Sequence, residues 1–303
     1  MMDQAERLRQ IIDNLKLRQA ISEANFLNTM KSKTAKVITI TSGKGGVGKT
    51  NITVNLAIAL SDMGKRVTIL DADFGLPNID VMLGIMPKYT LVDVINDNKN
   101  IFEVLSEGPK NIRFVSGGSG VEELVKLDKA QLDKFLSNIA LLDRISDVIL
   151  IDTGAGLSDN VMSFVMAADE VLLVTTPEPT SITDAYALIK MISNRDKDKK
   201  VRVVVNRAES PSEAKDILTK LSVVTDKFLE LKLDTLGYIP QDEMVIKAVK
   251  MQQPFSLSYP KCHASKQIKE ISSKILNVRN DMSNVENTGI KNFVSRLVNL
   301  WNT

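Results

Sequence analysis

Short apolar runs alternate with amphipathic stretches over most of the chain. The runs are rich in valine, isoleucine and leucine at consecutive positions, which is typical of parallel strands buried on both faces of a sheet. They span residues 36–41, 66–71, 111–116, 147–152, 170–175, 201–206 and 234–239. Amphipathic spacing predicts helices between them, at residues 51–62, 129–142, 181–194 and 212–226. The alternation predicts an α/β fold with a doubly wound, mostly parallel sheet and helices on both faces.

The pattern differs at the two ends of the chain, so four parts are expected. Residues 1–33 are polar and favour a helix, and residues 34–276 form the α/β domain. Residues 277–288 are polar and predict a linker, and residues 289–303 predict an amphipathic helix. One side of that last helix is apolar, with Ile290, Phe293, Val294, Leu297, Val298, Leu300 and Trp301.

The composition is that of an ordinary globular protein of 303 residues, with 44% hydrophobic and 25% charged residues. The formal net charge of +2 is too near neutral to favour nucleic acid as a partner through bulk charge. Cys262 is the single cysteine, which excludes a disulfide within the chain and a metal site made of cysteines alone. The first residues lack the apolar core of a signal peptide, and no run reaches the ~18–20 apolar residues that span a bilayer. We therefore expect a cytoplasmic protein.

Residues 43–50 carry the strongest chemical signal in the chain, Gly-Lys-Gly-Gly-Val-Gly-Lys-Thr. They fit the phosphate-loop pattern of glycine, four residues, glycine, lysine and then serine or threonine, between a strand and a helix. Glycines let backbone N–H groups wrap a polyphosphate, and the helix that follows adds its positive end. Lys49 can reach the β- and γ-phosphates, and Thr50 can ligate Mg²⁺. The residues expected to bind nucleotide here are Gly43, Lys44, Gly45, Gly46, Val47, Gly48, Lys49, Thr50 and Asn51.

Polar residues also end three other predicted strands, where a doubly wound sheet places its ligands. Asp71 and Asp73 follow the second strand, and two carboxylates two residues apart can face a metal ion and a water molecule. Asp152 ends the fourth strand, which is the usual place of an aspartate that holds Mg²⁺ directly or through water. Asn206 ends the sixth strand, and its amide can both donate to and accept from the edge of a base.

Lys44 sets this phosphate loop apart, because it is a second lysine directly after the first glycine. The order Lys-Gly-Gly-Val-Gly-Lys-Thr resembles the deviant Walker A motif of the MinD/ParA superfamily of P-loop NTPases, and the resemblance covers residues 36–276. It implies an ATPase that requires Mg²⁺ and acts as an ATP-bound homodimer. In that family the early lysine reaches the partner's nucleotide, so the resemblance implies that Lys44 and Lys49 are both catalytic.

The same resemblance implies roles for the aspartates at the strand ends. The segment that contains Asp71 and Asp73 resembles the first switch region of the family. There Asp73 would orient the attacking water, and Asp71 would support the magnesium shell. The segment around Asp152 resembles the second switch, so the expected metal ligands are Thr50, Asp71 and Asp152.

The base of the nucleotide is expected to lie beside two later segments. In the family an asparagine in the position of Asn206 reads adenine, and Arg207 directly follows it. The segment after the next strand resembles the loop that packs against the base, which implies contacts from Pro240 and Asp242.

The C-terminal segment resembles the membrane-targeting helix of MinD-like proteins. Its expected lipid-facing residues are Ile290, Phe293, Val294, Leu297, Val298 and Trp301. Burying seven apolar side chains contributes about 10 kcal/mol, and ordering a dozen residues costs about 12 kcal/mol, so one helix binds lipid only marginally. Two helices on an ATP dimer gain avidity, so attachment should depend on the nucleotide, and we expect the protein reversibly at the inner face of the cell membrane. The alternative is a closing helix packed on the protein's own surface, and the helix could exchange between the two places.

The first residues, Asp-Gln-Ala-Glu-Arg-Leu-Arg from position 3, match a short motif of the FlhG family of flagellar-number ATPases, also called YlxH or FleN. The match implies that this segment stimulates a signal-recognition-type GTPase, FlhF. Gln4 would lie near the GTP, and Arg7 and Arg9 would supply positive charge. Residues 175–186 also resemble this family. The resemblance implies a regulator of flagellar number or placement, with flagellar basal-body proteins as further partners.

Three other functions are compatible with the same phosphate loop. A MinD-type regulator of the division site would have a partner in the septum-inhibiting system and would stimulate no GTPase. A ParA-type DNA-partition ATPase would bind DNA nonspecifically with a steep dependence on salt. A nucleotide-gated scaffold would hydrolyse ATP negligibly.

Overall fold

The structure is a computed structural model that describes residues 34–73, 78–96, 99–117, 129–277 and 288–301. The chain divides into two compact units, residues 1–34 and 35–303. Every helix and strand described below lies in the second unit. The predicted N-terminal helix and its residues Gln4, Arg7 and Arg9 lie outside the described residues, as does most of the predicted linker.

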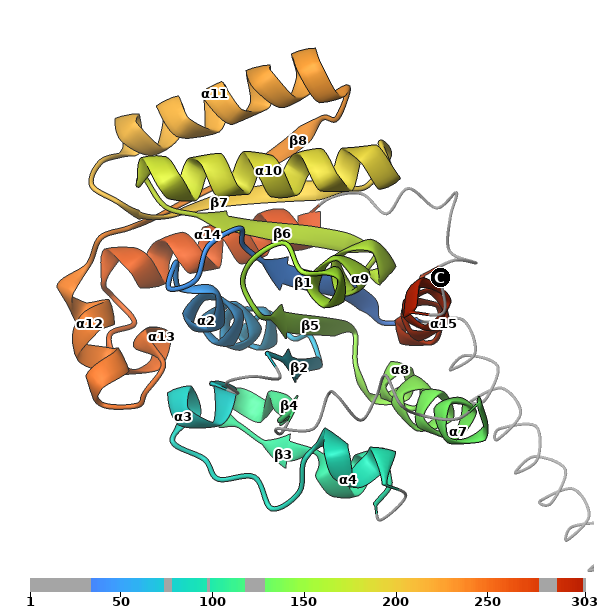
Figure 1. Cartoon of the computed structure of the whole chain (residues 1–303). Helices are drawn as coiled ribbons and strands as arrows, with labels where there is room; N and C mark the ends of the chain where they lie inside the picture. The colour runs from blue at the N-terminus through green and yellow to red at the C-terminus, as the bar shows by residue number, and fades with distance from the viewer. Residues whose placement is uncertain (1–33, 74–77, 97–98, 118–128, 278–287, 302–303) are drawn as a thin grey trace, which may run out of the picture. The chain divides into compact units, whose positions relative to one another are not determined.

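Within the described residues the second unit is built on an eight-stranded sheet with the order β3-β4-β2-β5-β1-β6-β7-β8 (Figure 1). Neighbouring strands are parallel except β3, which pairs antiparallel with β4. The strands are β1 (Lys36–Thr41), β2 (Val67–Ala72), β3 (Ser106–Glu107), β4 (Arg113–Val115), β5 (Val148–Thr153), β6 (Glu170–Thr175), β7 (Val201–Ala208) and β8 (Leu233–Pro240). The predicted α/β fold with a doubly wound, mostly parallel sheet is therefore confirmed.

The predicted strands all form, and the structure corrects some of their bounds. The predicted strand 111–116 shrinks to β4, because Pro109–Asn111 form a 3-10 turn before it. Strand β3 was not predicted, because two residues carry no readable periodicity. The predicted helix 129–142 ends at Ala140, and a second short helix follows Leu141. Asn277, predicted to begin the linker, is the last residue of a helix.

Helices cover both faces of the sheet (Figure 1). The longer ones are α2 (Lys49–Asp62), α7 (Lys129–Ala140), α9 (Asp159–Ala167), α10 (Pro179–Arg195), α11 (Pro211–Leu229), α14 (His263–Asn277) and α15 (Ile290–Trp301). The shorter ones are α3 (Ile79–Leu83), α4 (Leu91–Ile95), α5 (Ile101–Val104), α8 (Leu142–Ile145), α12 (Glu243–Lys250) and α13 (Phe255–Ser258).

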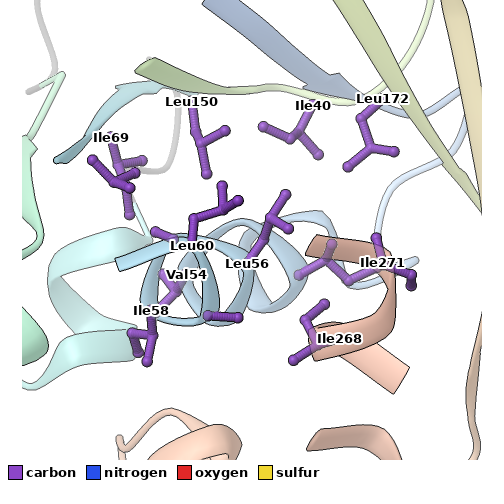
Figure 2. Close-up of a cluster of buried hydrophobic side chains, with 14 of the residues drawn as sticks. Ile40, Val54, Leu56, Ile58, Leu60, Ile69, Leu150, Leu172, Ile268 and Ile271 are labelled. Atoms are coloured by element: carbon purple, nitrogen blue, oxygen red, sulfur yellow. The ribbon is translucent and has the colours of Figure 1, made fainter. Parts of the chain in front are cut away.

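The core divides at the sheet because successive residues of a strand point to opposite faces. On one face, Ile40, Leu150 and Leu172 of the central strands pack against helices α2 and α14 (Figure 2). On the other face, Val37 and Ile151 pack with α4, α7, α9 and α15, while β6 and β7 pack with α10 and α11. Burial on both faces explains why the strands read as continuous apolar runs.

The C-terminal amphipathic helix forms as predicted, and in this structure it is α15, packed on the protein itself. Ile290, Phe293, Val294 and Leu297 are buried against α7 and α9. The ring of Phe164 on α9 lies 6.1 Å from that of Phe293 and 6.0 Å from that of Trp301, centroid to centroid. The apolar side expected to face lipid is therefore covered by the chain's own core.

Two carboxylates hold the first turn of α15 in place. Asp143 Oδ1 accepts the N–H of Ile290 at 3.1 Å and that of Ala35, which precedes β1, at 3.0 Å. Asp169 Oδ2 accepts the N–H of Val37 at 2.9 Å and that of Gly289 at 3.4 Å. Each carboxylate thus joins the start of the first strand to the start of the last helix.

Candidate nucleotide site

The phosphate loop connects β1 to α2 at the carboxyl edge of the sheet (Figure 1). Gly46 and Gly48 have φ values of 75° and 94°, a left-handed conformation that favours glycine. A Cβ atom on Gly48 would lie 2.5 Å from the amide nitrogen of Asn206, and one on Gly43 would lie 2.4 Å from the backbone of Asp184. Gly46 is therefore favoured by backbone conformation, Gly43 by a close neighbour and Gly48 by both.

Lys49 points into the protein at the start of α2 and is 8% exposed. Its Nζ donates to Ser42 Oγ at 3.0 Å, and Ser42 Oγ donates to the carbonyl oxygen of Lys44 at 2.6 Å. The carbonyl oxygen of Ser42 accepts the N–H of Gly156 at 3.0 Å. Ser42 therefore links both lysines of the loop to the segment after β5. The sequence analysis missed Ser42, which lies outside the motif.

Two of the predicted metal ligands form a buried acidic pair. Asp71 on β2 and Asp152 on β5 are partners in the parallel register of those strands. Burial raises the pKa of Asp152 to about 6, although hydrogen bonds from Thr50 and Thr53 and the charge of Lys49 oppose the rise. Burial, and then the charge of Asp152, raise the pKa of Asp71 to about 7.

A divalent cation fits this arrangement, because it would supply the positive charge that two buried carboxylates lack. Thr50 and Asp152 are hydrogen-bonded to each other, so both offer oxygen atoms at one point. Both carboxylate oxygens of Asp71 accept hydrogen bonds from the backbone. Its Oδ1 accepts the N–H of Asp73 at 3.1 Å, and its Oδ2 accepts the N–H of Asn78 at 3.1 Å. Asp71 therefore binds backbone groups that follow β2, and its expected support of the magnesium shell stays a prediction.

Asp73, in the first segment that resembles a switch region, lies close to the second such segment, after β5. A Cβ atom built on Gly154, after β5, would be 3.6 Å from Asp73 Oδ1. The charge of Asp73 also acts on Lys49, where burial lowers the pKa of the ammonium and Asp152 and then Asp73 oppose that fall. The aspartate predicted to orient water is thus close to the lysine predicted to hold the γ-phosphate.

Lys44 is held by its own chain. Its Nζ lies 2.7 Å from Glu178 Oε2 and 3.0 Å from Thr180 Oγ1, both at the start of α10. The lysine side chain is 38% exposed, so it lies at the surface beside the loop. Glu178 was not among the predicted site residues, because it is more than 130 positions away along the chain.

A pocket of about 430 Å³ opens beside the phosphate loop. It is lined by Gly48, Asn51, Ile52, Asn206, Arg207, Ile239, Pro240, Gln241, Asp242, Val245, Ile246, Val249, Lys250 and Phe255. The pocket brings together every residue that the sequence analysis assigned to the base. Its walls are largely apolar, as expected for a flat aromatic base.

The structure adds local detail at three of the residues predicted to lie beside the base. Asn206 Nδ2 donates to the carbonyl oxygen of Val47 at 2.7 Å, so one of its two N–H groups is hydrogen-bonded to the phosphate loop. Asp242 caps helices, accepting the N–H of Met244 at 2.9 Å and that of Ala264 at 3.3 Å. Arg207 lines the pocket and has φ 58° at a register irregularity between β7 and β8.

Comparisons with known proteins agree with this geometry. The family model for ParA, described as NUBPL iron-transfer P-loop NTPase, matches residues 33–276. The antiactivator FleN of Pseudomonas aeruginosa is 47% identical over 79% of this chain and 86% of its own length. The chain belongs to the MinD/ParA family of P-loop NTPases, in the branch of FleN and YlxH.

Two further relatives fall in the same family. The flagellum site-determining protein YlxH of Helicobacter pylori is 33% identical over 87% of this chain and 90% of its own. The crystal structure of the cell-division ATPase MinD of Pyrococcus furiosus superposes with a TM-score of 0.65, at 29% identity, over 80% of this chain and 98% of that one. The fold expected from the MinD/ParA resemblance is therefore confirmed.

Cysteine and histidine, side chains that commonly bind iron, are few in this sequence. The sequence has one cysteine and one histidine. Among the described residues no three histidine, cysteine, aspartate or glutamate side chains come together as a metal site. A MinD/ParA-type Mg²⁺ site has fewer protein ligands, because nucleotide phosphates and water complete its shell.

No described helix is long and apolar enough to cross a membrane.

Proposed function

We propose that this chain is a Mg²⁺-dependent ATPase that acts as an ATP-bound homodimer and regulates the number or placement of flagella. The observation that carries the ATPase proposal is the arrangement around Lys49. Thr50, Asp73 and Asp152 surround it within one subunit, and Lys44 lies at the adjacent surface. The flagellar part rests on the identity of 47% with FleN, against 34% with the MinD proteins of Helicobacter pylori and Thermotoga maritima.

In the proposed reaction, water attacks the γ-phosphorus of ATP in line, and no covalent enzyme intermediate forms. Mg²⁺, when bound, neutralises charge on the phosphate oxygens. Lys49 leaves Ser42 to contact the β- and γ-phosphates, and Asp73 accepts a hydrogen bond from the water and orients it. Lys44 leaves Glu178 and reaches the nucleotide of the partner subunit, so the monomer should turn over very slowly.

The decisive experiment measures oligomeric state and turnover in the same sample. The variant Asp73→Ala should bind ATP without hydrolysing it, and it should sediment as a dimer with Mg²⁺ and ATP and as a monomer with ADP. Wild-type protein should release phosphate only under conditions that also give the dimer. A D73A variant that stays monomeric at saturating ATP would contradict the dimer mechanism.

We propose that α15 exchanges between the protein core and a membrane surface. Its buried side carries the same residues that would enter lipid, so either the protein core or the lipid can cover the apolar side of the helix. Liposomes of phosphatidylglycerol and phosphatidylethanolamine should sediment the protein with ATP and leave it in solution with ADP. A chain ending at residue 288 should stay in solution under both conditions, and equal sedimentation of the two chains with ATP would contradict the proposed role of the helix.

We propose that residues 1–33 stimulate an FlhF-type GTPase through Gln4, Arg7 and Arg9. The proposal rests on the short motif at positions 3–9, together with the similarity to FleN and YlxH. GTP hydrolysis by such a GTPase should rise with the full chain and not with a chain that begins at residue 34. The triple variant Q4A/R7A/R9A separates the motif from the rest of the segment.

The GTP-hydrolysis assay also tests the division-site alternative, because a MinD-type regulator would leave GTP hydrolysis unchanged. A DNA-partition function would require ATP-dependent DNA binding that falls steeply with salt. The near-neutral net charge gives that alternative no support.

A further inference from the structure

One buried asparagine on α2 joins the two walls of the base pocket. Asn55 is 0% exposed and lies one helical turn after Asn51, which lines the pocket. Asn55 Oδ1 accepts the N–H of Ser256 at 2.8 Å, at the start of α13. Asn55 Nδ2 donates to the carbonyl oxygen of Asn51 at 2.8 Å and to Asn51 Oδ1 at 3.0 Å.

The backbone groups determine which way this amide points. The N–H of Ser256 can only donate, and the carbonyl of Asn51 can only accept, so the oxygen and nitrogen of Asn55 cannot be exchanged. Because the Asn55 nitrogen faces Asn51, the atom of the Asn51 side chain that meets it must be the oxygen. The amino group of Asn51 is then directed away from Asn55.

We infer that Asn55 is a positioning residue that makes Asn51 a hydrogen-bond donor to the bound nucleotide. Asn51 directly follows Thr50 and lines the pocket between the phosphate loop and the base. The atoms of a nucleotide in that region are phosphate and sugar oxygens, which accept hydrogen bonds. A flipped Asn51 amide would present a carbonyl oxygen to them and repel them. The inference rests on the proposed nucleotide binding.

Asn55 also fixes the opposite wall. The hydrogen bond to the N–H of Ser256 holds the first turn of α13, whose first residue, Phe255, is 2% exposed and lines the pocket. One side chain in the interior of α2 therefore sets both the polarity of Asn51 and the position of Phe255. An asparagine inside a helix is otherwise unfavourable, and here it satisfies backbone groups from two elements.

The test compares Asn55→Asp with Asn55→Ala, Asn51→Ala and the double variant N51A/N55D in the full chain. The aspartate keeps an acceptor for Ser256 but places a second acceptor against Asn51, so Asn51 must turn its nitrogen inward. We expect N55D to bind ADP about 10-fold to 100-fold more weakly, measured by calorimetry below the unfolding transition. N51A should lose a similar factor, and the double variant should lose little more. N55A, which has no opposing charge, should fall between wild type and N55D.

The ligand atom is identified by repeating the titration with AMP and adenosine. A contact to phosphate predicts that the effect of N55D disappears with adenosine, and a contact to the sugar predicts that it remains. Folded N55D and N55A proteins that bind ADP as tightly as wild type would overturn the inference. So would effects of N51A and N55D that multiply in the double variant. Wild-type protein that binds no ADP would overturn the proposed function itself, which is a different result.

Discussion

Lys44 Nζ and Glu178 Oε2 are 2.7 Å apart, so the lysine that is proposed to act on a partner's nucleotide is neutralised within its own subunit. The two side chains come from the phosphate loop and from the start of α10, which pack closely because Gly43 lies against Asp184. Lys44 must leave this carboxylate before it can reach another subunit. The proposed dimerisation would therefore compete with an intramolecular contact.

The first prediction concerns that competition. Glu178→Gln keeps the shape of the side chain and removes the charge that retains Lys44. Because both side chains are partly exposed, the effect should be modest, with half-maximal dimerisation at an ATP concentration lower by up to about fivefold. Analytical ultracentrifugation across an ATP series measures it. The control is Glu230→Gln, which removes an exposed glutamate paired with Lys197, away from the site. An equal shift in both variants would show that the contact plays no part.

The second prediction separates the two lysines of the loop. Lys44→Ala should leave ATP and ADP affinity nearly unchanged and reduce turnover by ~10²–10³, the usual loss for one preorganised charged contact. Lys49→Ala should weaken binding itself, because Lys49 is buried beside the phosphate site. Calorimetry and a phosphate-release assay on the two variants give the comparison. Normal turnover by K44A would contradict the proposed contact of Lys44 with the nucleotide of the partner subunit.

The third prediction concerns pH and follows from the acidic pair. The pKa values of Asp71 and Asp152 are raised by burial to about 7 and about 6, above the ordinary value of 3.8. A raised carboxyl pKa favours the folded protein at low pH, and that contribution is lost as the pH rises through about 6 to 7. Without nucleotide or Mg²⁺, the free energy of unfolding should therefore fall from about pH 4 to about pH 7 and level off above that.

Magnesium should reverse this trend, because it binds the ionised carboxylates. The gain in melting temperature on adding Mg²⁺ and ADP should be larger at pH 8 than at pH 6. Asp152→Asn should flatten the pH dependence in the absence of ligand and abolish most of the gain from Mg²⁺. Differential scanning calorimetry at several pH values measures both. A gain that is equal at pH 6 and pH 8 would contradict the assignment of Asp152.

The fourth prediction uses two glycines of the same loop as a matched pair. A Cβ atom at position 43 would lie 2.4 Å from the backbone of Asp184, whereas at position 45 the nearest atom is 3.9 Å away. Gly43→Ala should push α10 from the loop and lower the free energy of unfolding by roughly 1–3 kcal/mol, as overpacking does. Gly45→Ala should change it by less than about 0.5 kcal/mol. Urea unfolding without nucleotide measures both, and equal losses would contradict the close approach of α10.

The fifth prediction concerns the docking of α15. Asp143→Ala removes the acceptor shared by the N–H groups of Ala35 and Ile290, so the start of the helix keeps only Asp169 of its two carboxylate anchors. The variant should sediment with liposomes even when only ADP is present. Asp226→Ala, an exposed aspartate on α11, is the control and should behave as wild type. Unchanged sedimentation of the Asp143 variant would show that the anchor does not retain the helix.

The sheet could be predicted from the sequence because its strands are buried on both faces. Burial makes consecutive residues such as those of β5 apolar, and this local pattern is readable without knowledge of neighbours. The phosphate loop could also be predicted from local sequence, because Gly43 to Thr50 are contiguous and their chemistry depends on local backbone geometry. Strand β3 was missed because its short pairing depends on β4 and not on its own periodicity.

The tertiary structure alone decided the contacts between distant segments. Asn206 meets Val47 because β6 and β7 follow β1 across the sheet and bring their carboxyl ends to one edge. The same order brings Glu178 to Lys44, a pairing that no local pattern encodes. The sequence by itself determined that residues 290–301 form an amphipathic helix, because that depends on spacing within one segment. Only packing decided that its apolar side lies on α7 and α9, since burial requires a matching surface elsewhere in the chain.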